Sequence, residues 1–204
     1  MKINITNYCS IHNNQIKLNG ETLLVKEKQV PFNEFIKSTY DLNASPYMKF
    51  FKMDDLCKLA FLASEFLLKN KNLAEQYGSS TISLLFANTS SSLDTDINYY
   101  NTVKDFPSPS LFVYTLPNIM LGEISIRNKF KGENAFFVFE QFQADFLCNY
   151  ATQLIAEKKA KAVIIGWVEL LNDNQEAFLS LAEESENGTE LIAENLERLY
   201  ISNH

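Results

Sequence analysis

The sequence predicts an α/β domain in which helices cover a mixed sheet, and three observations support this fold class. Residues 131–170 have the pattern strand, helix, strand, which is typical of a βαβ crossover with two parallel strands. An apolar run at 81–87 precedes the crossover, and an alternating run at 177–183 follows it. The 204 residues are 46% hydrophobic with six glycines and five prolines, which favours one domain over residues 1–204.

The crossover at 131–170 is the best-defined part of the chain. Gly132 precedes an apolar run of strand length, Ala135 to Phe139. The predicted helix after it carries apolar residues every four positions, Phe142, Phe146, Tyr150 and Leu154, and lysines at its end, Lys158, Lys159 and Lys161. Ala162 to Val168 is the second strand. The turn at Glu140-Gln141 lies at the carboxyl end of a strand, where enzymes of this architecture place a nucleophile.

The segments before the crossover alternate between strand and helix. Residues 2–11 and 15–25 predict strands around Asn13-Asn14, and Asn19-Gly20 offers a second tight turn. Residues 30–44 are expected to be irregular or briefly helical.

A long helix is predicted at 54–69, with Asp54 or Asp55 as its cap. Phe61 and Leu62 widen its apolar stripe, so we expect it to be covered on more than one side. A short helix at 94–103, a loop at 106–110 and a helix at 116–126 lead into the crossover.

The end of the chain predicts a last strand and a closing helix. The strand at 177–183 follows a turn at 172–174 and is expected to run antiparallel to its predecessor. Thr189 is the predicted cap of the helix. Its apolar face contains Leu191, Ile192, Leu196 and Leu199.

Composition excludes several functional classes. The net charge of −7 argues against nucleic-acid binding, because phosphate contacts need clustered cations. No apolar run approaches the ~18 residues of a membrane span, and the N-terminus lacks the apolar core of a signal peptide. Cys9, Cys57 and Cys148 form neither a disulfide framework nor a metal pattern. We expect a reduced, cytoplasmic protein without a cofactor.

Three motifs in the crossover resemble the β-ketoacyl synthases, a family of the thiolase-like superfamily. Gly132-Glu133-Asn134 is similar to their Gly-Pro-Asn/Ser turn, Phe139-Glu140-Gln141 to their Thr-Ala-Cys elbow, and Gly166-Trp167-Val168-Glu169 to their Gly-Gly-x-Glu strand end. Gln141 lies nine residues after Gly132 and twenty-eight before Glu169, which are the family's spacings to its cysteine. The resemblance extends over about residues 50–185, including Lys52-Met53-Asp54 and the stretch from Pro109 to Gly122.

The resemblance implies a thiolase-like half domain, with a mixed five-stranded sheet and helices on both faces. Gln141 then occupies the position of the acyl-accepting thiol, and an amide is not a nucleophile. Glutamine also stands there in chain-length-factor subunits and decarboxylating ketosynthase-like domains. The family's catalytic histidines and lysine belong to the second half, so neither His12 nor His204 corresponds to them, and both are expected to be exposed.

These implications favour a non-catalytic accessory protein. Its partner would be a ketosynthase or an acyl carrier protein in fatty-acid, aryl-polyene or polyketide-type biosynthesis. One alternative is an acyltransferase or 3-oxoacyl-ACP synthase-type enzyme with Cys148 as nucleophile, although a helix cysteine is usually an inert apolar residue. Another is an acyl-chain binding protein. Gln141 could also cap its helix. Glu140 and Glu169 could form a carboxylate pair, but we expect them in surface or hydrogen-bonding roles.

The predicted strand before Gln141 is the candidate interface. It comprises Asn134, Ala135, Phe136, Phe137, Val138 and Phe139, without a charge. In ketosynthases the matching strand pairs with its symmetry mate. An open edge of this composition invites aggregation, and two-fold pairing would remove it. We therefore expect a homodimer in isolation, or a heterodimer with a full-length ketosynthase.

Overall fold

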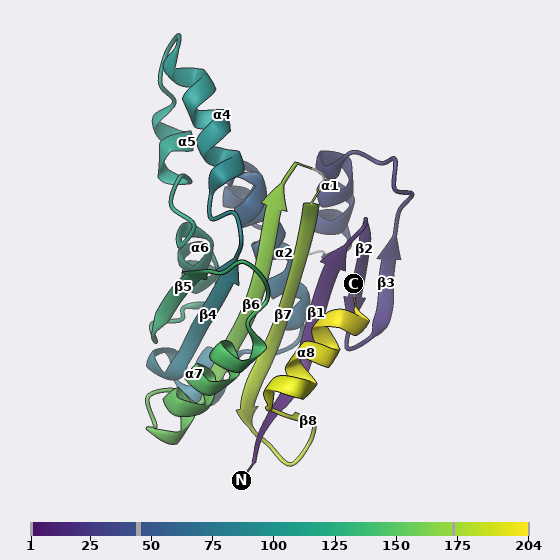
Figure 1. Cartoon of the computed structure of the whole chain (residues 1–204), viewed down its shortest axis with the longest axis vertical. Coiled ribbons are helices and arrows are strands. Elements are labelled where there is room, and N and C mark those ends of the chain that lie inside the picture. The colour runs from purple at the N-terminus through teal and green to yellow at the C-terminus, as the bar shows by residue number, and fades with distance from the viewer. Residues whose placement is uncertain (1, 44–45, 173, 204) are drawn as a thin grey trace.

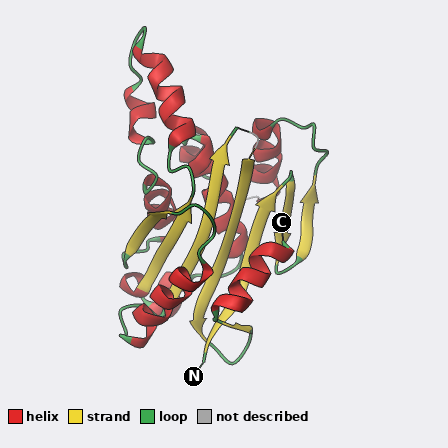
Figure 2. Ribbon diagram, in the orientation of Figure 1, coloured by secondary structure: helices red, strands yellow, loops and turns green. Residues whose placement is uncertain are grey.

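The protein is built on one mixed β-sheet with helices on both faces (Figures 1 and 2). The computed structural model describes residues 2–43, 46–172 and 174–203. In these residues the sheet has eight strands, in the order β3-β2-β1-β7-β6-β4-β5, with β8 paired to β1. The strands are β1 (Ile3–His12), β2 (Gln15–Leu18), β3 (Glu21–Val25), β4 (Ile82–Asn88), β5 (Asn134–Val138), β6 (Ala162–Leu171), β7 (Asn174–Glu184) and β8 (Thr189–Glu190).

The predicted crossover is confirmed. β5 and β6 are both parallel to β4, which lies between them, and α7 (Ala144–Ala156) connects them. β7 runs antiparallel to β6, as the sequence predicted. The carboxyl ends of β4, β5 and β6 therefore meet at one edge of the sheet. The predicted turn at 172–174 includes Asp173, which lies outside the described residues.

The prediction of five strands is wrong. The N-terminal strand β1 pairs along β7, and this pairing adds the whole N-terminal region to the central sheet. Residues 15–25 form two strands because Asn19 and Gly20 both take positive φ, 51° and 82°, and reverse the chain. Thr189 lies in the short strand β8 and is not a helix cap, so that prediction is also wrong. The closing helix α8 (Ala193–Ser202) begins four residues later.

Two apolar cores lie on opposite faces of the sheet. One contains residues of α1 (Phe32–Asn43), α2 (Asp55–Leu67) and α6 (Ile119–Asn128); the other contains residues of α7 and α8. Figure 1 shows α7 and α8 in front of the sheet and α2 behind it. The helices predicted on both faces are thus present, and the region predicted as irregular or briefly helical forms α1.

Helix α2 is buried on almost every side, as its wide apolar stripe predicted. The carboxylate of Asp54 caps it by accepting a hydrogen bond from the Cys57 amide at 3.0 Å. This carboxylate also accepts one from the Thr95 hydroxyl at 2.5 Å. Burial raises the pKa of Asp54 above its usual value, in spite of these hydrogen bonds, which lower it.

A helical arm extends beyond the sheet (Figure 1). It consists of α4 (Leu93–Val103) and α5 (Pro109–Val113). The sequence predicted α4 but assigned residues 106–110 to a loop. Pro109 instead starts α5, and Ser108 caps it by accepting from the Leu111 amide. The short elements α3 (Leu73–Tyr77), η1 (Met48–Lys52) and η2 (Ser79–Thr81) complete the described fold.

Candidate functional site at the carboxyl ends of the parallel strands

Gln141 lies on the surface, in the bend that connects β5 to α7. Helix α7 begins at Ala144, and its N-cap residue is Gln143, which makes no side-chain capping hydrogen bond. The interpretation of Gln141 as the cap of this helix is therefore wrong. Its amide is exposed at the carboxyl edge of the sheet.

An open pocket of about 340 Å³ borders Gln141. Its walls combine three aromatic side chains, Phe142, Trp167 and Tyr200, with three carboxylates, Glu140, Glu176 and Glu197. The Phe142 and Tyr200 rings stack with centroids 4.3 Å apart, so the last helix, α8, is packed directly against the start of α7. None of the described residues that line this pocket is a cysteine or a lysine.

Glu169 has the hydrogen-bonding role that the sequence predicted. It is buried at the end of β6, and its carboxylate accepts hydrogen bonds from the backbone amides of Thr89 and Ser90 at 2.8 and 3.1 Å. It also accepts from the Ser90 hydroxyl and from the Leu170 amide. The carboxylate thus fixes the loop after β4, whose donors would otherwise be unsatisfied. Glu140 lies at the surface, as predicted.

Glu176 is a site residue that the sequence did not reveal. It is buried in β7, where its carboxylate accepts hydrogen bonds from Trp167 Nε1 at 2.6 Å and from the Tyr200 hydroxyl at 3.2 Å. Burial, and next the charge of Glu176, raise the pKa of Tyr200 well above its usual range. The spacing along the strand could have indicated that Glu176 is buried. Glu176 precedes the buried Phe178 by two residues in β7, so both side chains lie on the same face of the sheet.

His12 is only partly exposed, so the expectation of an exposed side chain is wrong. Its side chain is 24% exposed, and Nδ1 lies 3.8 Å from the second carboxylate oxygen of Glu176. The end of β1 is brought to this carboxylate because β1 pairs with β7, with His12 opposite Glu176. His204 lies outside the described residues.

Cys148 is buried in α7 and does not line the pocket beside Gln141. Burial, followed by the nearby charge of Asp145, raises the pKa of its thiol to about 11. The thiolate is the reactive form of cysteine, so both effects oppose reaction near neutral pH. Cys9 and Cys57 are buried as well. Within the described ranges, no group of three histidine, cysteine or acidic residues could hold a metal ion.

Strand β5 is an open edge of the sheet, since the only strand it pairs with in the described chain is β4. Val138 is 55% exposed. Phe137 and Phe139 form an aromatic cluster with Phe146 and Tyr150 of α7, with the ring centroids of Phe137 and Phe146 4.8 Å apart. An uncharged edge strand with partly exposed aromatic residues is the geometry expected of an interface strand.

Several solved structures share the fold of this chain. No family model and no curated protein sequence matches the chain. The structure titled "The ishigamide ketosynthase/chain length factor" matches with a TM-score of 0.65 and 15% identity, over 93% of this chain and 64% of that one. The structure of a ketosynthase (ApeO) in complex with its chain length factor (ApeC) from Xenorhabdus doucetiae matches with a TM-score of 0.58 and 12% identity. The match covers 100% of this chain and 92% of that one. The chain has the fold of ketosynthases and chain-length factors.

A third match shows how the lengths compare. The structure titled "AntDE:AntF (apo): type II PKS acyl-carrier protein in complex with its ketosynthase bound to the hexaketide" gives a TM-score of 0.59 and 14% identity, over 97% of this chain and 64% of that one. The chain thus spans less than two thirds of the ishigamide and AntDE:AntF chains, but nearly all of the matched ApeO–ApeC chain. The described helices include none that is both long and apolar enough to cross a membrane.

Proposed function

We propose that this protein is a non-catalytic, ketosynthase-like subunit that pairs with a ketosynthase. The observation that carries the proposal is Gln141, an exposed amide at the position that the family resemblance assigns to the acyl-accepting thiol. The amide nitrogen lone pair is delocalised, and the group has no ionisable proton to lose near neutral pH. Cys148 is no substitute, because it is buried and the pKa of its thiol is raised.

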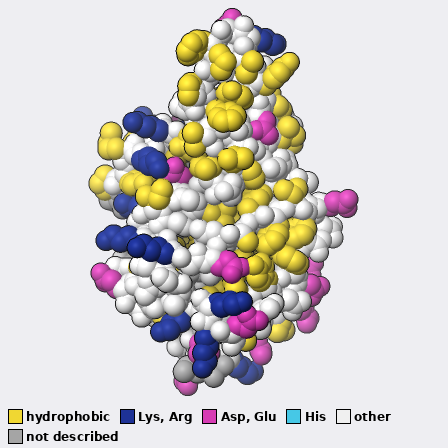
Figure 3. Space-filling view, turned by 90° about the vertical axis from the view of Figure 1, so that its left-hand side faces the viewer, with side chains coloured by type: hydrophobic (Ala, Val, Ile, Leu, Met, Phe, Trp, Pro, Cys, Tyr) yellow, Lys and Arg dark blue, Asp and Glu magenta, His cyan; other side chains and the backbone are white. Residues whose placement is uncertain are grey.

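The surface that would receive the partner is the open edge β5, together with the helical arm. Figure 3 shows apolar side chains on this side of the molecule, over the arm and on the body below it. The exposed apolar residues of the arm and its loops are Leu93, Ile97, Tyr100, Val103, Phe106, Phe112, Val113 and Leu116. Apolar surface of this extent is typical of interaction sites, and strand pairing at β5 would satisfy its free backbone groups.

The comparisons suggest what kind of partner fits this surface. One similar structure is a ketosynthase in complex with its chain length factor, and another includes an acyl carrier protein. By analogy the partner is a full-length ketosynthase that acts in fatty-acid, aryl-polyene or polyketide-type biosynthesis. An acyl carrier protein would deliver the substrate of that ketosynthase. In isolation the same edge would pair with a second copy of the chain. The acidic composition and three free cysteines favour a cytoplasmic location.

Co-purification with the ketosynthases of the host tests this proposal. Val138→Lys places a charge at the exposed last residue of β5 and should abolish capture. Val25→Lys is the matched control, because Val25 is 60% exposed on β3, the opposite edge of the sheet. Equal capture by both variants would contradict the β5 interface. Formation of 3-oxoacyl product by the purified protein alone would contradict the non-catalytic role.

A further inference from the structure

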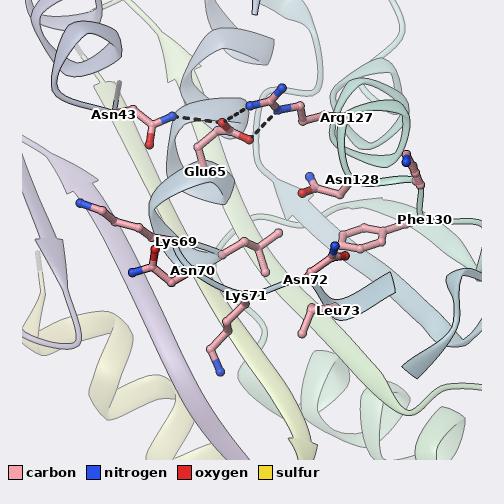
Figure 4. A pocket seen from close by; sticks show the side chains of 12 residues that line it. Asn43, Glu65, Lys69, Asn70, Lys71, Asn72, Leu73, Arg127, Asn128 and Phe130 are labelled. Carbon is pink, nitrogen blue, oxygen red and sulfur yellow. Dashed lines mark hydrogen bonds and ion pairs between the residues drawn. The ribbon is translucent and has the colours of Figure 1, made fainter. Parts of the chain in front are cut away.

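A second cavity, of about 460 Å³, lies away from the carboxyl ends of the parallel strands (Figure 4). It is bordered by the end of α2 and by the end of α6, at the loops that lead toward the starts of β4 and β5. Parallel strands begin at one edge of a sheet and end at the other, so this cavity is at the opposite edge from Gln141. The proposed function does not use it.

The lining of this cavity is cationic in a protein whose net charge is −7. The lining residues include three lysines and one arginine but a single carboxylate, that of Glu65. Figure 4 shows the Arg127 guanidinium and the Asn43 amide directed at this carboxylate. Arg127 donates from Nε at 3.1 Å and from Nη2 at 3.0 Å, and Asn43 donates at 3.0 Å. Glu65 is therefore already paired and hydrogen-bonded.

The positive charge that remains comes from two of the three lysines. Lys71 is paired with an acidic residue, because its Nζ lies 3.7 Å from the carboxylate of Glu183. Lys69 and Lys129 are exposed, and neither has an acidic partner within 4.0 Å among the described residues. Four asparagines also line the walls: Asn43, Asn70, Asn72 and Asn128. The Asn43 amide donates to Glu65 and the Asn128 amide to Ile124, so Asn70 and Asn72 supply the amide donors for a ligand. This set of donors and cations suits an anion with several acceptor oxygens.

Lysines near helix ends often serve only to neutralise the last carbonyl groups. Here the chain itself provides several of those hydrogen bonds. At the end of α2, the amides of Leu68 and Lys69 donate to the carbonyls of Ser64 and Phe66 at 2.9 and 3.2 Å. At the end of α6, the Phe130 amide donates to Ser125 and the Asn128 side chain to Ile124, both at 3.0 Å. The lysine ammonium groups are thus not required as caps.

We infer that this cavity binds a small soluble molecule carrying a phosphoryl group. Its volume is in the range of small-molecule sites, and lysine is a common point-charge partner of phosphate. The flexible stems of Lys69 and Lys129 allow both ammonium groups to turn toward one ligand. Repulsion by the acidic remainder of the protein is screened beyond about 10 Å at 0.1 M salt, so the local charge decides.

Titration with pyrophosphate tests the site, with amide NMR signals of the whole chain as readout. We expect saturable shifts at Asn70, Asn72 and Asn128. The double variant Lys69→Gln/Lys129→Gln should weaken binding about tenfold, as expected for two solvent-exposed charge contacts. The control Lys37→Gln/Lys104→Gln removes the same charge from exposed positions outside the cavity and should bind like the wild type.

Three results would overturn the inference. One is equal shifts with sodium chloride at matched ionic strength, which would indicate screening and not binding. The second is equal weakening in both double variants. The third is binding to anionic phospholipid vesicles, but not to pyrophosphate, because the cavity would then serve a membrane surface. Both double variants should keep the melting temperature of the wild type, since their substituted side chains are exposed. None of these outcomes bears on β5 or Gln141.

Discussion

Strands β5 and β6 are joined by one crossover, yet they occupy opposite situations in the sheet. Both have strongly apolar sequences, Ala135-Phe136-Phe137-Val138 and Ala162-Val163-Ile164-Ile165. β6 lies between β4 and β7 and is buried along almost its whole length. β5 has one neighbour and exposes both of its ends. An apolar strand sequence therefore does not reveal whether the strand lies at the centre of the sheet, as β6 does, or at its edge, as β5 does.

The largest effect is expected where β6 is most tightly packed, at Gly166. A Cβ there would lie 2.6 Å from Leu179 Cδ2 and 2.7 Å from Phe86 Cδ1, both fully buried. Gly166→Ala should lower the free energy of unfolding by about 3 kcal/mol, measured by urea denaturation. Gly122→Ala makes the same change in α6, where the added Cβ would meet no atom within 4 Å apart from nearby backbone of its own helix, and should raise the free energy of unfolding by about 0.5 kcal/mol. If both variants were equally stable, β6 would not be tightly packed at Gly166.

The next effect concerns the carboxyl ends of these strands. Glu169→Gln places an amide donor among the donors of Thr89, Ser90 and Leu170, and should cost about 2 kcal/mol of stability. Glu140→Gln makes the same change at the surface after β5 and should be neutral within about 0.5 kcal/mol. Equal stabilities would mean that Glu169 does not hold the loop after β4.

A charge at the exposed end of β5 is expected to change the mass of the particle in solution, and not the stability of the fold. Val138→Lys and Val25→Lys should both unfold within about 0.5 kcal/mol of the wild type, because both side chains are exposed. In light scattering, the wild type and Val25→Lys should be dimers, whereas Val138→Lys should be a monomer. A monomeric wild type at micromolar concentration would exclude the homodimer.

These contrasts also mark how far the sequence could predict the fold. Periods of two and about four residues identified the crossover and the buried helix α2, since both depend on local patterns. The number of strands depends on the pairing of β1 with β7, more than 160 residues away, which periodicity cannot reveal. The same pairing brings His12 to Glu176. The family resemblance implies that Gln141 occupies the nucleophile position, but its exposure follows from the bend before α7, which begins only at Ala144.

Cys148, between the two strands in the crossover, gives a smaller and pH-dependent effect. The pKa of its thiol is about 11 in the folded protein, and an unfolded cysteine titrates near about 8.5. As the pH rises, the Cys148 thiol loses its proton in the unfolded chain before it does so in the folded protein. The contribution of Cys148 to the free energy of unfolding is therefore present below about pH 8.5 and is lost as the pH rises toward 11. Peptide mapping after iodoacetamide treatment at pH 8 should find Cys148 labelled slowly in native protein and rapidly in urea. Rapid labelling of Cys148 in the native protein would instead support its thiol as the nucleophile of an enzyme.

The smallest effects are expected at Gln141 itself. Gln141→Ala should unfold within about 0.5 kcal/mol of the wild type, because the side chain is exposed and does not cap α7. Gln141→Cys tests whether the position still activates a thiol. Helix N-termini lower thiol pKa values, but α7 begins three residues later, so we expect the new thiol to titrate near about 8.5. Glu140→Cys, in the same exposed bend, is the reference, and absorbance of the thiolate is the measurement. If only Gln141→Cys titrated well below that value and accepted acyl groups from a thioester, the site would retain its catalytic geometry and lack only the nucleophile.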